Sequence, residues 1–166
     1  MHILVRLYLR TAFLFLALGL LGGLWIEFQL VSGGTISHGM IVAHVHLLLV
    51  GFLLMTIFGV AFWLFPRSGR GQPIGPYPNL VAFAYVLLTL GTVVRAVTEF
   101  FDLQLAAQAW GYVRLAASSA QVAGIAIGVV ALWGRIRGAA FSKLDVPPAE
   151  PPAGGSGARP SSSAPA

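Results

Sequence analysis

Four apolar runs dominate this chain of 166 residues, and each is long enough to cross a lipid bilayer. They lie near residues 7–30, 39–65, 80–100 and 110–134, and about 20 apolar residues suffice for a membrane-spanning helix. Lipid offers no hydrogen-bonding partners to backbone groups, so the runs are predicted to be helical. With 57% hydrophobic and 9% charged residues, the composition is that of a membrane protein. The sequence predicts an all-α, integral membrane four-helix bundle over residues 1–141.

Segments of turn-forming or polar residues separate the runs. Ser32-Gly33-Gly34 follows the first run, prolines and glycines fill 66–78, and a short polar stretch surrounds Asp102. The first run is longer than the apolar part of a signal peptide, so it is predicted to remain as a helix. Residues 142–166 are rich in Pro, Ala, Gly and Ser. This tail is predicted to be disordered, because it cannot bury enough apolar surface to fold.

The basic residues flank the apolar runs in a pattern that predicts the orientation of the chain. Two connections, after the first and third runs, contain no Lys or Arg. Because cytoplasmic loops are enriched in basic residues, both termini are predicted to be cytoplasmic, in a multi-pass protein of the inner (cytoplasmic) membrane. We therefore interpret the basic residues as topology signals and expect no nucleic-acid partner. The flanking basic residues are Arg6 and Arg10 at the start of the first run, Arg67 and Arg70 after the second, and Arg135, Arg137 and Lys143 after the fourth.

Two histidines lie inside the second apolar run. The chain has no cysteine, which excludes thiolate metal sites, iron–sulfur clusters and thioether-linked haem. His44 and His46 are predicted to lie roughly 8–12 Å deeper than His38, which is near the outer surface. Residues two apart on a helix differ in direction by about 200°, so these two imidazoles leave nearly opposite sides and do not easily chelate one ion. They are suited to holding different groups, and no copper site is recognisable.

Other polar side chains are predicted at a similar depth on the third and fourth helices. Arg95 and Glu99 have i, i+4 spacing and can simply pair with each other, while Arg114 can reach the membrane surface. The alternative is a haem, in which an imidazole ligates the iron and Arg95 and Arg114 pair with the propionates. Its apolar walls would include Leu47, Leu48, Phe52 and Met55.

The predicted cofactor is thus a non-covalent haem, of b type. The candidate metal ligands are His44 and His46. The other candidate cofactor-binding residues are His38, Arg95, Glu99 and Arg114.

The second run also carries a resemblance to a known family. His44-Val45-His46-Leu47, Gly51-Phe52, the segment 58–63 and Phe65-Pro66-Arg67 together resemble one helix of subunit I of the haem–copper oxidases and of nitric oxide reductase. The resemblance implies that His44 ligates a high-spin haem and His46 a low-spin haem. Through Arg95-Ala96-Val97-Thr98-Glu99, the whole chain is also similar to short four-helix proteins that are oxidase subunit I-like.

The chain departs from the full-length enzymes in its number of helices and ligands. Those enzymes have about three times as many helices and take further metal ligands from them, whereas the first, third and fourth runs here contain no histidine. One chain alone is therefore not a complete terminal oxidase. A five-coordinate haem, a haem completed by a second subunit and a relic that keeps only the fold all remain open.

Two hypotheses follow for the function. The first is a haem-binding membrane protein for electron transfer, or for binding nitric oxide or oxygen, in a respiratory context. The second is a cofactor-free accessory or assembly subunit of a respiratory membrane complex; a small transporter has less support. Small residues at Gly19, Gly23 and from Ala116 to Gly128 favour either a homo-oligomer, contact with respiratory subunits, or packing inside the bundle.

Overall fold

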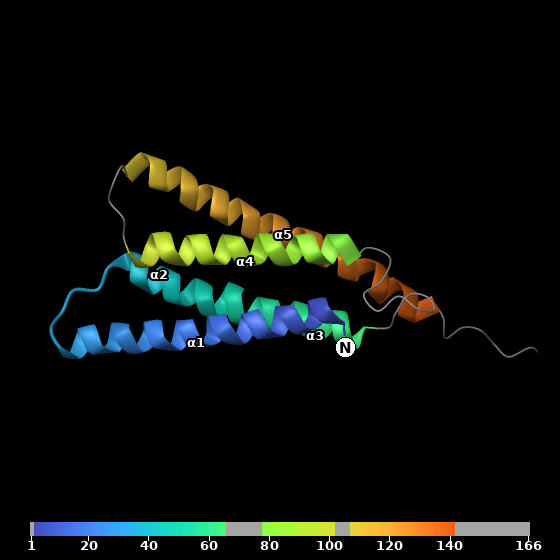
Figure 1. Cartoon of the computed structure of the whole chain (residues 1–166), viewed down its shortest axis with the longest axis horizontal. Coiled ribbons are helices and arrows are strands. Elements are labelled where there is room, and N and C mark those ends of the chain that lie inside the picture. Colours follow the sequence, from blue (N-terminus) through green and yellow to red (C-terminus); the bar gives the residue numbers. More distant parts are fainter. Residues whose placement is uncertain (1, 66–77, 102–106, 142–166) are drawn as a thin grey trace, which may run out of the picture.

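The computed structural model describes residues 2–65, 78–101 and 107–141. Its helices, in chain order, are α1 (Ile3–Val31), α2 (His38–His46), the π-helix η1 (Leu47–Leu54), α3 (Met55–Leu64), α4 (Pro78–Phe100) and α5 (Ala107–Phe141). The segments α2, η1 and α3 follow one another without a break and form one rod (Figure 1).

Within these described ranges, four helices are long and apolar enough to cross a membrane, at 29, 27, 23 and 25 residues. The shortest measures about 35 Å, against a hydrocarbon core of about 30 Å. The prediction of an all-helical, multi-pass membrane protein is confirmed to this extent. The predicted orientation of the termini stays a prediction. The segments 66–77, 102–106 and 142–166, which include Arg67, Arg70, Asp102 and the predicted disordered tail, lie outside the described residues.

Two features of the helices differ from the sequence prediction. α1 begins at Ile3 and α5 continues to Phe141, because hydropathy locates only the lipid-spanning part of a helix, which can extend further into water. The second helix contains eight residues of π-helix directly after His46. Such segments are rare and often occur at functional sites. Nothing in the apolar pattern of Leu47–Leu54 distinguishes a π-helix from an α-helix.

The ends of the first two helices are set by local hydrogen bonds. The Nδ1 atom of His2 accepts the backbone N–H of Leu4 at 3.2 Å and caps α1. Gly33, with φ 71, supplies the left-handed residue that follows α1. The hydroxyl of Ser37 accepts the N–H of Met40 at 3.2 Å and caps α2. His2 is therefore engaged in capping, far along the chain from the other histidines.

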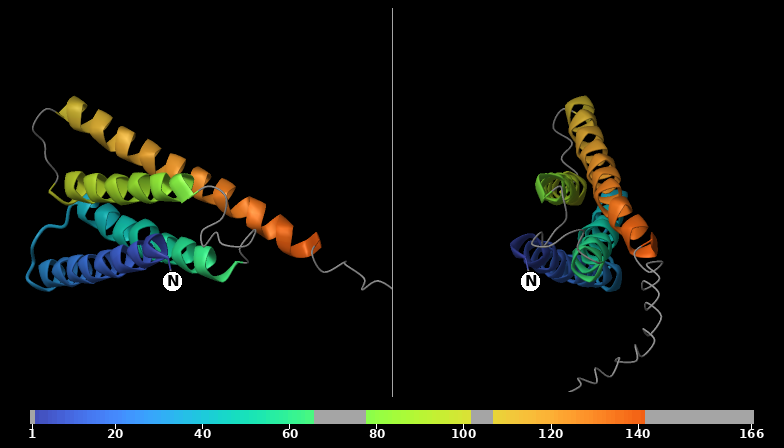
Figure 2. Two further views of the ribbon diagram at one scale, coloured as in Figure 1. Left: turned by 45° about the vertical axis from the view of Figure 1, so that its right-hand side comes forward. Right: turned by 90° about the vertical axis from the view of Figure 1, so that its right-hand side faces the viewer.

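The helices run antiparallel to their neighbours in the order in which they occur (Figures 1 and 2). α1 lies along the rod of α2, η1 and α3, α2 packs on α4, and α4 packs on α5. α5 crosses α4 obliquely, and the two helices diverge toward the beginning of α5 (Figure 1). The N-terminus, the end of α3 and the beginning of α4 share one end of the molecule, which we call the N-terminal end. The opposite end is called the far end.

The core lies toward the N-terminal end. Tyr8 of α1 is fully buried, its ring centroid lies 5.8 Å from that of Phe62, and its hydroxyl donates to the carbonyl of Val81 at 3.1 Å. Gly124 and Gly128 of α5 admit Leu88 and Phe58, since a Cβ at either glycine would come within 3 Å of these side chains. The small residues of α5 at these two positions therefore serve packing inside the molecule.

Much of the apolar surface remains exposed, as expected for helices that face lipid. Large exposed side chains occur on every membrane-long helix, including Leu14, Leu21, Leu24, Ile57, Trp63, Phe83, Leu90, Leu115, Val122 and Trp133.

Candidate functional site

His44 packs against α1 rather than into the space between all four helices. Its Nδ1 atom lies 2.8 Å from the carbonyl oxygen of Gly19. A Cβ at Gly23 would lie 2.8 Å from Cε1 of the imidazole, so this glycine provides the space for the ring. A carbonyl only accepts, which assigns the proton to Nδ1 and leaves a lone pair on Nε2. Gly23 thus accommodates a histidine of the same chain, whereas a Cβ at Gly19 would meet Leu48.

His46 faces α4, on the other flank of the helix, as the sequence predicted. Its Nδ1 atom lies 2.9 Å from the carbonyl oxygen of Val42, one turn earlier in α2, and 3.9 Å from Oε2 of Glu99. The Val42 carbonyl assigns the proton to Nδ1 here as well. In the part of the chain that the structure describes, neither Nε2 atom makes a hydrogen bond.

A chain of polar contacts connects α4 to α5 at the same level. Nε of Arg95 lies 2.9 Å from Oε1 of Glu99, an ion pair that lacks the angle of a hydrogen bond. Nη1 of Arg95 donates to the hydroxyl of Ser118, which in turn donates to the carbonyl of Arg114 at 2.8 Å. Deeper in the molecule, the amide of Gln121 donates to the hydroxyl of Thr92 at 3.1 Å. Arg95 therefore already has a carboxylate and a hydroxyl as partners.

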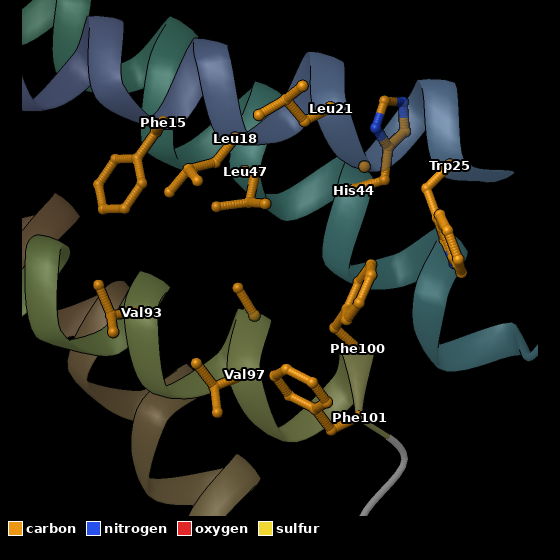
Figure 3. Close-up of a pocket in the computed structure, with 12 residues that line it drawn as sticks. Phe15, Leu18, Leu21, Trp25, His44, Leu47, Val93, Val97, Phe100 and Phe101 are labelled. Carbon is orange, nitrogen blue, oxygen red and sulfur yellow. The ribbon is translucent and has the colours of Figure 1, made fainter.

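An apolar groove of about 500 Å³ lies between the far halves of α1 and α4 (Figure 3). Side chains of α1 and α4 face each other across it, and His44 and Leu47 contribute from the α2 side. His44 lies at its edge with the ring turned toward α1. The remaining lining residues are Phe15, Leu18, Leu21, Gly22, Trp25, Val93, Ala96, Val97, Phe100 and Phe101.

The predicted site residues are therefore brought together only in part. His46, Glu99 and Arg95 form one cluster, which also contains Ser118, while His44 lies at the groove without them. Arg114 is half-buried and contributes its backbone carbonyl to that cluster, and the exposed His38 begins α2. Four residues were predicted to form apolar walls around the haem, and of these only Leu47 lines the groove. Met55 is fully buried and belongs to the core.

Sequence reasoning missed the part played by Gly39. A Cβ at this position would overlap the carbonyl oxygen of Glu99, so the glycine allows α2 to approach the backbone of α4. That approach places the carboxylate of Glu99 beside His46, two helical turns along α2. A glycine near the beginning of a membrane helix indicates that another helix can approach closely there. The sequence does not say which helix that is.

Among the described residues, no group of three or more His, Asp or Glu side chains is arranged to hold a bare metal ion. Comparison with known protein families, curated proteins and solved structures found no match for this chain.

Proposed function

We propose that this protein binds haem in the membrane, with His44 and His46 as the iron ligands, and acts in electron transfer or in binding nitric oxide or oxygen. The observation that carries the proposal is the hydrogen bonding of the two imidazoles. Each donates Nδ1–H to a backbone carbonyl, Gly19 for one and Val42 for the other. Metal-ligating histidines use this arrangement, because it fixes the tautomer and leaves Nε2 free for the metal.

The groove adds a second, weaker support for His44 alone, because His46 does not line it. Its volume of about 500 Å³ falls within the range of about 300–1,000 Å³ that is usual for ligand sites, and apolar walls are typical of such sites. With Nδ1 engaged by a carbonyl and Nε2 free on each imidazole, the donor set fits a haem, which when bound would supply the redox and gas-binding chemistry. The respiratory context rests on the resemblance of residues 44–67 to subunit I of the oxidases.

The arginines favour a second candidate function, a cofactor-free accessory or assembly subunit of a respiratory membrane complex. Neither Arg95 nor Arg114 lines the groove. Arg95 is engaged by Glu99 and Ser118 without any cofactor. The polar cluster then serves only to hold α2, α4 and α5 together.

A visible spectrum of the full chain, purified in detergent from cells supplied with haem precursors, separates these functions. Haem binding predicts a Soret band and sharp α bands on reduction. His44→Ala and His46→Ala should each remove or shift this absorbance, whereas His2→Ala should leave it unchanged, because His2 caps α1.

Two results would overturn the haem proposal. One is a featureless spectrum of a chain that is helical by circular dichroism, which supports the accessory role instead. The other is full haem retention in the double alanine variant of His44 and His46.

A further inference from the structure

Glu99 is the most deeply buried acidic side chain that the structure describes. The residue is 5% exposed, and its Oε2 atom has no hydrogen-bond partner among the described residues. Buried carboxylate oxygens normally accept hydrogen bonds, and one without a donor is costly. The Nδ1 atom of His46 lies 3.9 Å from Oε2.

The carboxylate of Glu99 is held in this place from two sides. Gly39 allows α2 to lie directly on the Glu99 backbone. Arg95, anchored on Ser118 of α5, pairs with the other carboxylate oxygen, Oε1. Oε1 is thereby engaged by the guanidinium, and Oε2 is left near His46 without a hydrogen-bond partner among the described residues. The imidazole, in contrast, rests on a neutral carbonyl of its own helix, Val42.

A carboxylate is a stronger acceptor than a carbonyl. Hydrogen bonds to charged groups are roughly twice as strong as those between neutral groups. Reducing the separation of 3.9 Å to hydrogen-bond length requires a movement of about 1 Å. This movement requires a turn of the His46 side chain, which is 24% exposed and so not locked by packing on every side. Nδ1–H would then donate to Oε2 of Glu99 in place of the Val42 carbonyl, and Nε2 would remain free for iron as before.

We propose that Glu99 is a positioning residue for His46, accepting its Nδ1–H and so making the imidazole a more basic iron ligand. This inference rests on the proposed haem function. A carboxylate behind a ligating histidine fixes the ring and increases the electron donation of the ligand. The additional donation stabilises ferric iron and lowers the midpoint potential of the haem. Glu99 would act on a bound haem only through His46, which lies 3.9 Å from its carboxylate.

The test compares midpoint potentials of the purified, haem-loaded chain. Glu99→Gln keeps the size of the side chain and removes its charge, so the midpoint potential should shift upward, with haem affinity about 10- to 100-fold lower. Arg95→Gln removes the compensating cation and should shift the midpoint potential downward. Shifts of opposite sign are not expected from two variants that only loosen packing. Glu27→Gln, the same substitution at an exposed position of α1, should shift nothing.

A second readout does not depend on haem. In the chain labelled with ¹⁵N-histidine, the Nδ1 resonance of His46 should move in Glu99→Gln and stay in place in Glu27→Gln. Where Glu99→Gln does not give folded protein, Glu99→Asp carries the test, since its shorter carboxylate should give a smaller upward shift of the midpoint potential.

The outcomes distinguish this inference from the function on which it rests. A wild-type chain without haem overturns both. A haem whose spectrum depends on His46, together with a Glu99→Gln midpoint potential equal to that of wild type, overturns the role of Glu99 and leaves haem binding intact. Downward shifts in both Glu99→Gln and Arg95→Gln also overturn it, because the sign for Glu99 is then wrong.

Discussion

The substitution Gly39→Ala tests the close packing of α2 on α4. A Cβ at this position would overlap the carbonyl oxygen of Glu99 and lie 3.2 Å from its carbonyl carbon. These are backbone atoms, which cannot turn aside as a side chain can. The helices must therefore separate by about 1 Å to restore a C···O contact of about 3.3 Å.

The expected cost follows from this separation. Overpacking of a tight interface costs about 1–3 kcal/mol, and the backbone contact places Gly39→Ala at the upper end. A loss of about 3 kcal/mol lowers the folding equilibrium constant about 100-fold. The same movement withdraws Glu99 from His46, so it also alters the surroundings of the imidazole.

The measurement is an unfolding titration of the purified chain with SDS in mixed micelles, followed by far-UV circular dichroism. Gly111→Ala is the matched control, because a Cβ at Gly111 meets nothing within 4 Å. Alanine is favoured over glycine in a helix by up to about 1 kcal/mol, so this control should be as stable as wild type or slightly more stable. Gly39→Ala should unfold at a clearly lower SDS fraction.

One result would refute the reasoning. If Gly39→Ala unfolds at the same SDS fraction as wild type, α2 and α4 do not approach each other as described. The placement of Glu99 beside His46 then loses its support too.

Three further predictions concern the orientation and the polar contacts between helices. A reporter fused after Ser142 should be cytoplasmic, as the distribution of basic residues predicts; a periplasmic reporter contradicts this. Arg95→Leu should destabilise the chain by about 3–5 kcal/mol, because Glu99 is left buried and unpaired. Adding Glu99→Leu should restore most of that loss, and purely additive costs in the double-mutant cycle would argue against the ion pair. Gln121→Leu should cost about 0.5–2 kcal/mol through the lost bond to Thr92, and wild-type stability in the SDS titration would count against that bond.

The number and type of the membrane segments could be predicted from the sequence. Each apolar run is longer than the hydrocarbon core requires, and a backbone in lipid must satisfy its own hydrogen bonds, so a helix is the only solution for an isolated run. The divergence of His44 and His46 was equally predictable, since it depends only on the rise and turn of one helix. Both inferences are local, and both need only the order of the residues.

What the sequence could not decide is which helix meets each polar side chain. Equal depth in the membrane suggested one site for His44, His46, Arg95 and Arg114. Depth, however, fixes one coordinate only, and the direction of a side chain around the helix axis depends on how the helices pack. In the structure, Gly23 makes room for His44 against α1, where the Gly19 carbonyl accepts its Nδ1–H, and Gly39 brings Glu99 to His46.

The π-helix is another feature that the sequence did not predict and only the structure revealed. The sequence of Leu47–Leu54 predicts an ordinary apolar α-helix, yet in the structure these eight residues form a π-helix between α2 and α3. The geometry of the helix and the lipid environment determined which segments of this protein are helices. Contacts between residues far apart in the sequence, which form only where small residues let two backbones approach, decided the composition of its candidate site.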